Sequence, residues 1–285
     1  MLTWQDFPTD EDKIPDFISQ MIAEHEQNEA VEMARTANLY DHQKNKTVNE
    51  YVQKIYSSTG VSVRNYVASN NKIASNFFRR LNTQRCAYSL GNGVTFASDK
   101  DTDGKVKQDG GTKAKLGKTF DTELYRAGYL ALIHGVSFVF FNFDHIHVFP
   151  LTEFVPLWDE NDGTLRAGLR YWRIDGTKPT IAVLYTEDGY RRFKSKSGYA
   201  RFEKDGDLRA YKQTISKAPA DAEPEVIAEE NYSRLPIVPL WGSRLHQSTL
   251  VGLQQSIDSY DLIRSGFAND LQDCAQIYWI LENYG

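Results

Sequence analysis

The chain has 285 residues, enough for one large domain or two ordinary ones, each with a sizeable core. Its composition, with 41% hydrophobic and 25% charged residues, is that of a soluble globular protein. The formal net charge of −5 argues against a protein that clamps nucleic acid tightly without regard to sequence, because that task needs a basic face.

The start of the chain, its longest apolar run and its cysteines set further limits. The first residues, MLTWQDFPTDED, contain no basic stretch followed by an apolar one, so no secretory signal is visible. The longest apolar run, residues 136–141, is far too short to span a bilayer, and no membrane partner is expected. Cys86 and Cys274 lie in apolar, helix-like contexts without a paired spacing. We therefore expect two buried free thiols in a reducing compartment.

Residues 1–88 are predicted to form an N-terminal helical region. A first helix is expected over residues 15–40, because it starts with Pro15, which is favoured in a first helical turn. A second is expected over residues 48–56, where the sequence Ser-Ser-Thr-Gly follows and breaks it. The third, over residues 63–81, has one apolar face and carries basic residues on the other.

Residues 89–243 are predicted to form a β-rich domain. A strand over residues 94–98, a loop rich in Gly, Asp and Lys, a helix over 122–133 and a buried strand over 136–144 lead into it. An antiparallel meander then follows, with hairpin signals in the pairs that begin at Asp162, Asp175, Asp188 and Asp205, each followed by Gly. An acidic linker over residues 216–231 precedes a Pro-spaced strand over 235–243.

Residues 244–285 are predicted to form one long helix. From Leu250 to Leu281 apolar residues recur every three or four positions, and a continuous helix here would be about 45–50 Å long. A stripe of that length needs a partner, which we expect upstream in the chain or on another subunit. Gly266 is a candidate kink, since Gly costs about 1 kcal/mol relative to Ala inside a helix. The polar face of this helix carries Asp258, Asp261, Asp270 and Asp273 against the single Arg264. The fold class that follows is α+β, with N-terminal helices packed on an antiparallel β-rich domain and a long C-terminal helix.

One loop is a candidate calcium site. Asp99, Asp101 and Asp103 occupy positions 1, 3 and 5 of a calcium-binding loop, and Gly104 occupies position 6. Oxygen ligands at alternate positions around a Gly turn suit a hard cation. Position 12, however, is Gly110, where such loops carry a bidentate Glu. A solvated loop rich in Asp, Lys and Gly is the alternative, and no other cofactor is expected.

Other motifs give little support to catalysis. The sequence GTKAKLGKT, residues 111–119, has five residues between its glycines, where the ATP-binding loop has four, and no buried strand precedes it. His145 and His147 share one face of a strand and can be metal ligands, but no third ligand lies at a recognisable spacing. A partly buried strand face is the alternative reading of this pair. Because no serine nucleophile elbow, Cys–His pair or HExxH motif is present, an enzyme is not indicated.

Three segments, taken in order, resemble the portal proteins of tailed bacteriophages. The first is NNKIASNFFRRLNTQRCAYSLGNGVTF, residues 70–96, with an Asn-rich helix, a Gly-Asn turn and a strand. The second is FDTELYRAGYLALIHGVSFVFFNFD, residues 120–144, with a helix, a Gly and a strand. The third is LPIVPLWGS followed by QSIDSYDLIRSGFANDLQD, within residues 235–273. Their common order across most of the chain makes the resemblance more specific than any one segment.

The resemblance implies a subunit of a ring, typically of twelve copies, through which double-stranded DNA is packaged and ejected at one capsid vertex. The partners implied are further copies of the chain, the terminase, capsid and scaffold proteins and a tail adaptor. The location implied is the virion, with assembly in the host cytoplasm and no catalysis by the ring itself. Residues 89–243 then correspond to the wing and 244–285 to the first stem-like helix. Because members usually continue well past the equivalent of Gly285, this helix is expected to be truncated, in a fragment or in a shortened relative. The residues expected to face a channel or a subunit interface are Asp258, Asp261, Arg264, Asp270 and Asp273.

Two other functions stay open from the sequence. The first is a monomeric virion or host-interaction module that shares only the fold. The second is a metal-dependent hydrolase that uses His145, His147 and acidic neighbours.

Overall fold

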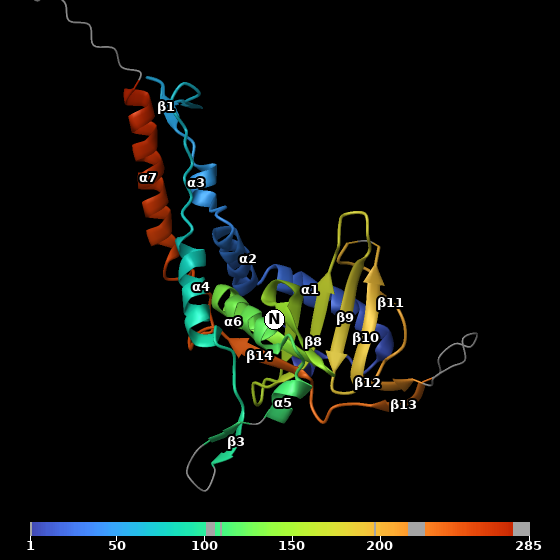
Figure 1. Ribbon diagram of the computed structural model, residues 1–285. Coiled ribbons are helices and arrows are strands. Elements are labelled where there is room, and N and C mark those ends of the chain that lie inside the picture. The colour runs from blue at the N-terminus through green and yellow to red at the C-terminus, as the bar shows by residue number, and fades with distance from the viewer. Residues whose placement is uncertain (1, 101–105, 109, 197, 216–225, 276–285) are drawn as a thin grey trace, which may run out of the picture. The chain divides into compact units, whose positions relative to one another are not determined.

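The computed structural model describes residues 2–100, 106–108, 110–196, 198–215 and 226–275 (Figure 1). The described residues form helices and antiparallel sheets, which confirms the predicted α+β class. They divide into two compact units. Unit 1 comprises Met1–Arg35 and Gln84–Thr249, and unit 2 comprises Thr36–Thr83 and the chain from Leu250 onward.

Helix α2 (Glu29–Asp41) and helix α4 (Phe77–Leu90) each cross from one unit to the other. This division groups the chain differently from the boundaries expected at residues 88 and 243, because it joins the segment 36–83 to the last helix. The expected boundaries themselves stay predictions.

Unit 1 contains most of the sheet structure. Its described helical elements are η1 (Trp4–Asp6), η2 (Glu11–Lys13), α1 (Ile14–Glu26), α5 (Gly110–Lys115), α6 (Phe120–His134) and η3 (Leu151–Glu153). Its described strands are β3 (Ala97–Lys100), β4 (Val106–Gln108), β5 (Val136–Asn142), β6 (His145–Pro150), β7 (Phe154–Trp158), β8 (Leu165–Trp172), β9 (Thr180–Thr186), β10 (Gly189–Ser195), β11 (Glu203–Lys204), β12 (Lys212–Ile215), β13 (Val226–Glu230) and β14 (Ile237–Trp241). The predicted helix over 122–133, the buried strand after it and the meander are confirmed.

A five-stranded antiparallel sheet, in the order β11-β10-β9-β8-β7, separates two apolar cores. Successive side chains of a strand point to opposite faces, and β9 shows the result. Ala182 and Leu184 join the core that contains α1, whereas Val183 and Tyr185 join the second core. Helix α1 buries its residues at helical spacing against the first face: Ile14, Phe17, Ile18, Met21 and Ile22.

The second core lies between the five-stranded sheet and a three-stranded sheet in the order β14-β5-β6. Phe138 of β5 is fully buried there and lies 4.4 Å from the Phe154 ring, centroid to centroid. Helix α6 packs against β5, β6 and β14. The strand pairs therefore bring β14, late in the chain, next to β5 in the middle of the unit.

The end of α6 depends on a glycine. Gly135 has a φ of +92°, and its N–H donates to the Ala131 carbonyl at 2.8 Å. A Cβ at this position would lie 2.9 Å from the carbonyl carbon of Gln247. Both the left-handed backbone and this close approach require Gly.

A buried histidine links α1 to the five-stranded sheet. His25 is 1% exposed, and its Nδ1 lies 2.9 Å from the Tyr171 hydroxyl. That hydroxyl donates to the Glu26 carboxylate at 2.5 Å, so the imidazole Nδ1 is the donor to Tyr171. Burial lowers the pKa of His25 to about 4. This histidine is therefore neutral at pH 7.

Unit 2 contains α3 (Lys46–Glu50), a hairpin of β1 (Lys54–Tyr56) and β2 (Ser62–Arg64), and α7 (Gln254–Cys274), together with parts of α2 and α4. Helix α7 runs without a break through Gly266. Cys86 is buried as expected, but Cys274 is exposed, which corrects the prediction of two buried thiols.

The predicted N-terminal helices are wrong in part. The helix expected over 15–40 is two helices, because Asn28 accepts the Ala30 N–H with its side chain at 2.9 Å and starts α2 afresh. The second expected helix ends early, and its C-terminal part forms β1. The third expected helix is wrong over residues 63–76, which form β2 and then a stretch without helix or strand. The helix itself is α4.

Candidate functional site

Helix α7 presents a row of polar side chains at four-residue spacing. Asp261, Ser265, Asn269 and Asp273 are four residues apart and share one face of the helix. Asp261 is fully buried and Ser265 is 5% exposed. A polar row that is buried needs hydrogen-bond partners on the segment packed against it.

The partners come from residues 69–75, which we call the strap; Figure 1 shows it beside α7. The strap uses the backbone N–H of every second residue. Ser69 donates to Asp273 Oδ1 at 3.1 Å, Asn71 to Asn269 Oδ1 at 2.6 Å, Ile73 to Ser265 Oγ at 3.0 Å and Ser75 to Asp261 Oδ1 at 3.0 Å. The strap and the helix therefore run antiparallel, joined by a ladder of backbone-to-side-chain bonds.

Two repeat distances explain why this ladder is regular. Four residues of an α-helix advance about 6 Å, and two residues of an extended chain advance about 6.5 Å. The four acceptors lie within 12 residues of helix, about 18 Å, and the six-residue span of the strap covers that length only when nearly extended. The strap is therefore an extended segment whose N–H donors bond to a helix instead of to a strand.

Three further hydrogen bonds attach the N-terminal part of unit 2 to α7. Asn45 Nδ2 donates to the second oxygen of Asp261 at 2.5 Å. Tyr40 donates its hydroxyl to Asp258 Oδ1 at 2.5 Å, and Thr47 donates to Asp258 Oδ2 at 2.9 Å. Burial, with the bond to Asp258, raises the pKa of Tyr40 to about 12. Both carboxylates thus act as acceptors that join α7 to the rest of its unit.

A different face of α7 carries large apolar side chains that the described residues leave exposed. Tyr260, Ile263, Phe267 and Leu271 are 45%, 73%, 64% and 59% exposed. Their spacing of three and four residues makes them one stripe, which we call the apolar stripe. Tyr260 contacts the Phe77 ring at a centroid distance of 5.1 Å. The rest of the stripe is available to a partner.

The sequence singled out five polar residues of this helix for a channel or interface. Asp258, Asp261 and Asp273 accept hydrogen bonds inside unit 2, and full burial of Asp261 gives it a packing role that the sequence does not predict. Arg264 and Asp270 are exposed. The facing of a channel or a neighbouring subunit stays a prediction.

The candidate calcium loop lies largely outside the described residues. Asp101 and Asp103 are outside the described residues, and of Asp99 only the backbone, in β3, is described. Calcium binding by this loop stays a prediction.

The sequence GTKAKLGKT, which resembles a phosphate-binding loop, begins inside a short helix. Residues 110–115 form α5, and the Lys113 ammonium lies 2.6 Å from the Asp121 carboxylate. Lys113 also donates to the Val94 carbonyl at 3.0 Å. These bonds tie Lys113 to its own unit, and the absence of nucleotide binding stays a prediction.

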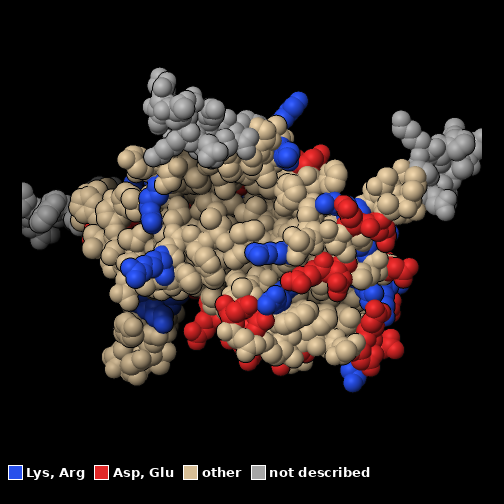
Figure 2. Space-filling model, turned by 90° about the horizontal axis from the view of Figure 1, so that it is seen from below, with Lys and Arg blue, Asp and Glu red and all other residues tan. Residues whose placement is uncertain are grey.

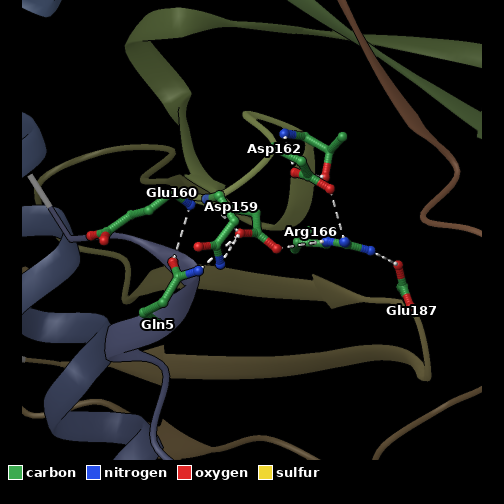
Figure 3. A network of polar contacts seen from close by, with 8 residues as sticks. Gln5, Asp159, Glu160, Asp162, Arg166 and Glu187 are labelled. Atoms are coloured by element: carbon green, nitrogen blue, oxygen red, sulfur yellow. Dashed lines mark hydrogen bonds and ion pairs between the residues drawn. The ribbon is translucent and has the colours of Figure 1, made fainter.

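Acidic residues gather at the turn between β7 and β8, where Figure 3 shows Arg166 among three carboxylates. The guanidinium lies 3.2 Å from Asp159, 3.1 Å from Asp162 and 3.6 Å from Glu187. Hydrogen bonds, first from the Asn161 N–H to Asp159 and from Thr164 to Asp162, lower the pKa of both Asp carboxyls. Gln5 also donates to Asp159, at 2.8 Å. Through Gln5, this cluster joins the first residues of the chain to the turn.

On the side shown in Figure 2, some Lys and Arg side chains lie next to Asp and Glu side chains, and others are surrounded by uncharged residues. Arg191 pairs with Glu11 at 3.0 Å, and Lys194 pairs with Asp205 at 2.8 Å. Each of these two basic side chains is therefore neutralised by a carboxylate of its own unit.

His145 and His147 lie on one face of β6, as the sequence predicts. Among the described residues, no group of three or more His, Cys, Asp or Glu side chains is arranged to hold a metal ion. The hydrolase alternative therefore has no three-ligand catalytic site in this part of the chain. Within the same residues, no helix combines the length and apolarity needed to cross a membrane.

Comparison with known proteins decides the family. The family described as phage portal protein, SPP1 Gp6-like, matches residues 19–285, nearly the whole chain. The chain belongs to this portal protein family. A curated relative, the portal protein of Clostridium phage phiCD119, is 38% identical over 60 residues. That segment covers 21% of this chain and 13% of the relative, so the match spans far less than two thirds of the relative's length.

Membership confirms the resemblance seen in the sequence. The match includes the strap, α7 and the β-rich part of unit 1, so the features described above belong to the portal segment. Sequence reasoning found α7 and its apolar residues. It missed the strap, in which Ser69, Asn70, Asn71 and Ser75 are a weak local signal for a segment that is not a helix.

Proposed function

We propose that this chain is the subunit of a portal ring, a channel for double-stranded DNA during packaging and ejection. Membership of the portal family over residues 19–285 carries the proposal. The ring has twelve copies in this proposal, and the terminase, capsid and scaffold proteins and tail adaptor dock on it. The ring is part of the virion, assembles in the host cytoplasm and has no catalytic activity of its own.

The apolar stripe supports the ring. Ile263, Phe267 and Leu271 are each more than half exposed in a single chain, and burial of such side chains stabilises association by about 25 cal/mol per Å² of apolar area. The proposed occupant is a second copy of the chain. In a ring the contact is heterologous, so the stripe of one subunit meets a different surface of its neighbour.

The charge of the chain supports a channel past which DNA slides. The formal net charge is −5, and the ion pairs above neutralise several basic side chains. Each phosphate that a Lys or Arg holds adds affinity, and a conduit needs low affinity along its wall. Arg264 and Asp270, both exposed on α7, are the proposed channel- or interface-facing residues.

Electron microscopy of the complete gene product in negative stain, together with its native mass, tests this function. The proposal expects closed rings with a central channel and a mass of about twelve subunits. Monomers that persist at high protein concentration would overturn it and favour the monomeric module.

A further inference from the structure

Two histidine side chains converge on one point beside β6. His145 Nε2 and His147 Nε2 lie 3.0 Å apart, and the two rings meet edge to face at a centroid distance of 4.6 Å. Both residues pair with β5, opposite Asn142 and Phe140 respectively. The sheet therefore fixes the backbone beneath the two rings, and little ordering is required to bring the nitrogens together.

A carboxylate orients one of these rings. Asp144 Oδ1 lies 2.5 Å from His145 Nδ1. Because the carboxylate accepts a hydrogen bond there, Nδ1 of His145 holds the ring proton, and the Nε2 lone pair is left to accept or to ligate. A carboxylate behind a metal-binding imidazole is the usual outer partner of such ligands.

We propose that His145 and His147 chelate a divalent transition-metal ion, Cu²⁺ or Ni²⁺, through their two Nε2 atoms. With metal–nitrogen bonds of about 2.0–2.1 Å, nitrogens 3.0 Å apart subtend an angle of about 90° at the metal. That angle matches neighbouring positions of a square-planar or tetragonal ion. Tetrahedral Zn²⁺ needs nitrogens about 3.3 Å apart at the same bond length, so it fits less well.

The proton balance of binding is simple. Without metal, one Nε2 donates a hydrogen bond to the other, so with His145 protonated at Nδ1 the donor is His147. Chelation moves the His147 proton from Nε2 to Nδ1 of the same ring, and no net proton is released. The two bonds to the metal ion replace the hydrogen bond between the two rings, and the ion lies to one side of the line that joins the nitrogens.

The surroundings leave room for the remaining ligands. Asn142 has its side-chain amide nitrogen 3.5 Å from His145 Nε2, so its oxygen becomes a third ligand once the amide group turns over. Asn142 and His147 line a cavity of about 450 Å³, which holds space for water on the open coordination positions. With two protein nitrogens the site binds metal reversibly. It differs from the three-ligand catalytic site that the described residues lack.

Titration of the complete, tag-free chain with CuCl₂, NiCl₂ and ZnCl₂ tests the site. The affinity is expected to fall in the order Cu²⁺, Ni²⁺, Zn²⁺. His145→Ala and His147→Ala are each expected to weaken Cu²⁺ binding at least tenfold, and Asp144→Asn about tenfold through loss of the outer partner. His42→Ala, at an exposed histidine of unit 2, serves as the matched control and is expected to bind as the wild type does.

Electron paramagnetic resonance of the Cu²⁺ complex gives a second readout. The wild type is expected to show hyperfine coupling to two imidazole nitrogens, and each single His variant to one. The proposal is overturned if the wild type binds no Cu²⁺, if His147→Ala keeps wild-type affinity, or if the spectrum of the double His variant equals that of the wild type.

Discussion

The backbone N–H of Ser75 donates a hydrogen bond to the buried carboxylate of Asp261 at 3.0 Å, across 186 residues of sequence. Asn45 donates to the other oxygen of the same carboxylate. One side chain of α7 thus joins the end of the strap to the N-terminal part of unit 2. Because Asp261 is fully buried, its side-chain oxygens need these donors in place.

Asp261→Ala is expected to lower the free energy of unfolding of unit 2 by about 3 kcal/mol, since it leaves two buried donors without an acceptor. Chemical denaturation, with hydrogen exchange of residues 69–75, measures this loss and the accompanying loss of amide protection. Asp270→Ala, on the exposed surface of the same helix, is the matched control and should change stability by less than about 0.5 kcal/mol. Equal effects of the two variants would contradict the assignment.

Ile73→Pro is expected to destabilise the strap, because it deletes the N–H that donates to Ser265. Ala74→Pro is the control, since the alternate N–H groups take no part in the ladder. The expected difference is about 1–2 kcal/mol in the free energy of unfolding of unit 2, again read by denaturation. If Ala74→Pro costs as much as Ile73→Pro, the every-second-residue ladder is wrong.

The strap is a segment whose structure the sequence does not predict. Apolar residues at helical spacing favour a helix over residues 63–81, which include the strap, yet the N–H groups of the strap bond to side chains roughly 200 residues later. Local propensity is overridden by acceptors that no local window contains. In α6, β5 and the meander the periodicity and the packing agree, and there the prediction holds.

In the candidate site, too, one part could be predicted from the sequence and another could not. The amphipathic spacing of α7 predicts the positions of its apolar residues. Ile257 is buried in the single chain, whereas the four residues of the apolar stripe are exposed. The acidic residues read as a solvated face, because nothing in the sequence shows that Asn45, Tyr40 and Ser75 bind them. Burial of a charge depends on partners that only the fold brings together.

Gly135→Ala is expected to cost about 3 kcal/mol in the free energy of unfolding of unit 1. It adds a Cβ 2.9 Å from the Gln247 backbone at a φ of +92°. Gly163→Ala also has a positive φ, +67°, but no atom lies within 4 Å of its added Cβ. Its expected cost is about 1 kcal/mol, from backbone strain alone. Thermal denaturation of both variants separates the cost of backbone strain from the cost of the steric clash. Equal decreases in melting temperature would contradict the close packing at the end of α6.

Acid is expected to weaken unit 1 through His25. Its folded pKa of about 4 lies below the ordinary value of 6.5, so the unfolded state takes up a proton first as the pH falls. Stability is full above pH 6.5 and declines towards pH 4, by about 2 kcal/mol between pH 7 and pH 5 from this residue. Denaturation curves at the two pH values should show His25→Gln with a smaller decline than the wild type. An unchanged decline would refute the role of His25.

The assembly state of the Ile263→Asp variant of the complete gene product tests the central claim most directly. Ile174→Asp is the matched control, because Ile174 in unit 1 is 76% exposed and Ile263 is 73% exposed. If the apolar stripe joins neighbouring subunits of a portal ring, native mass measurements will find the Ile263→Asp variant mainly as monomers and the Ile174→Asp variant as rings of wild-type mass. Wild-type rings from Ile263→Asp, or equal loss of rings in both variants, would contradict the claim.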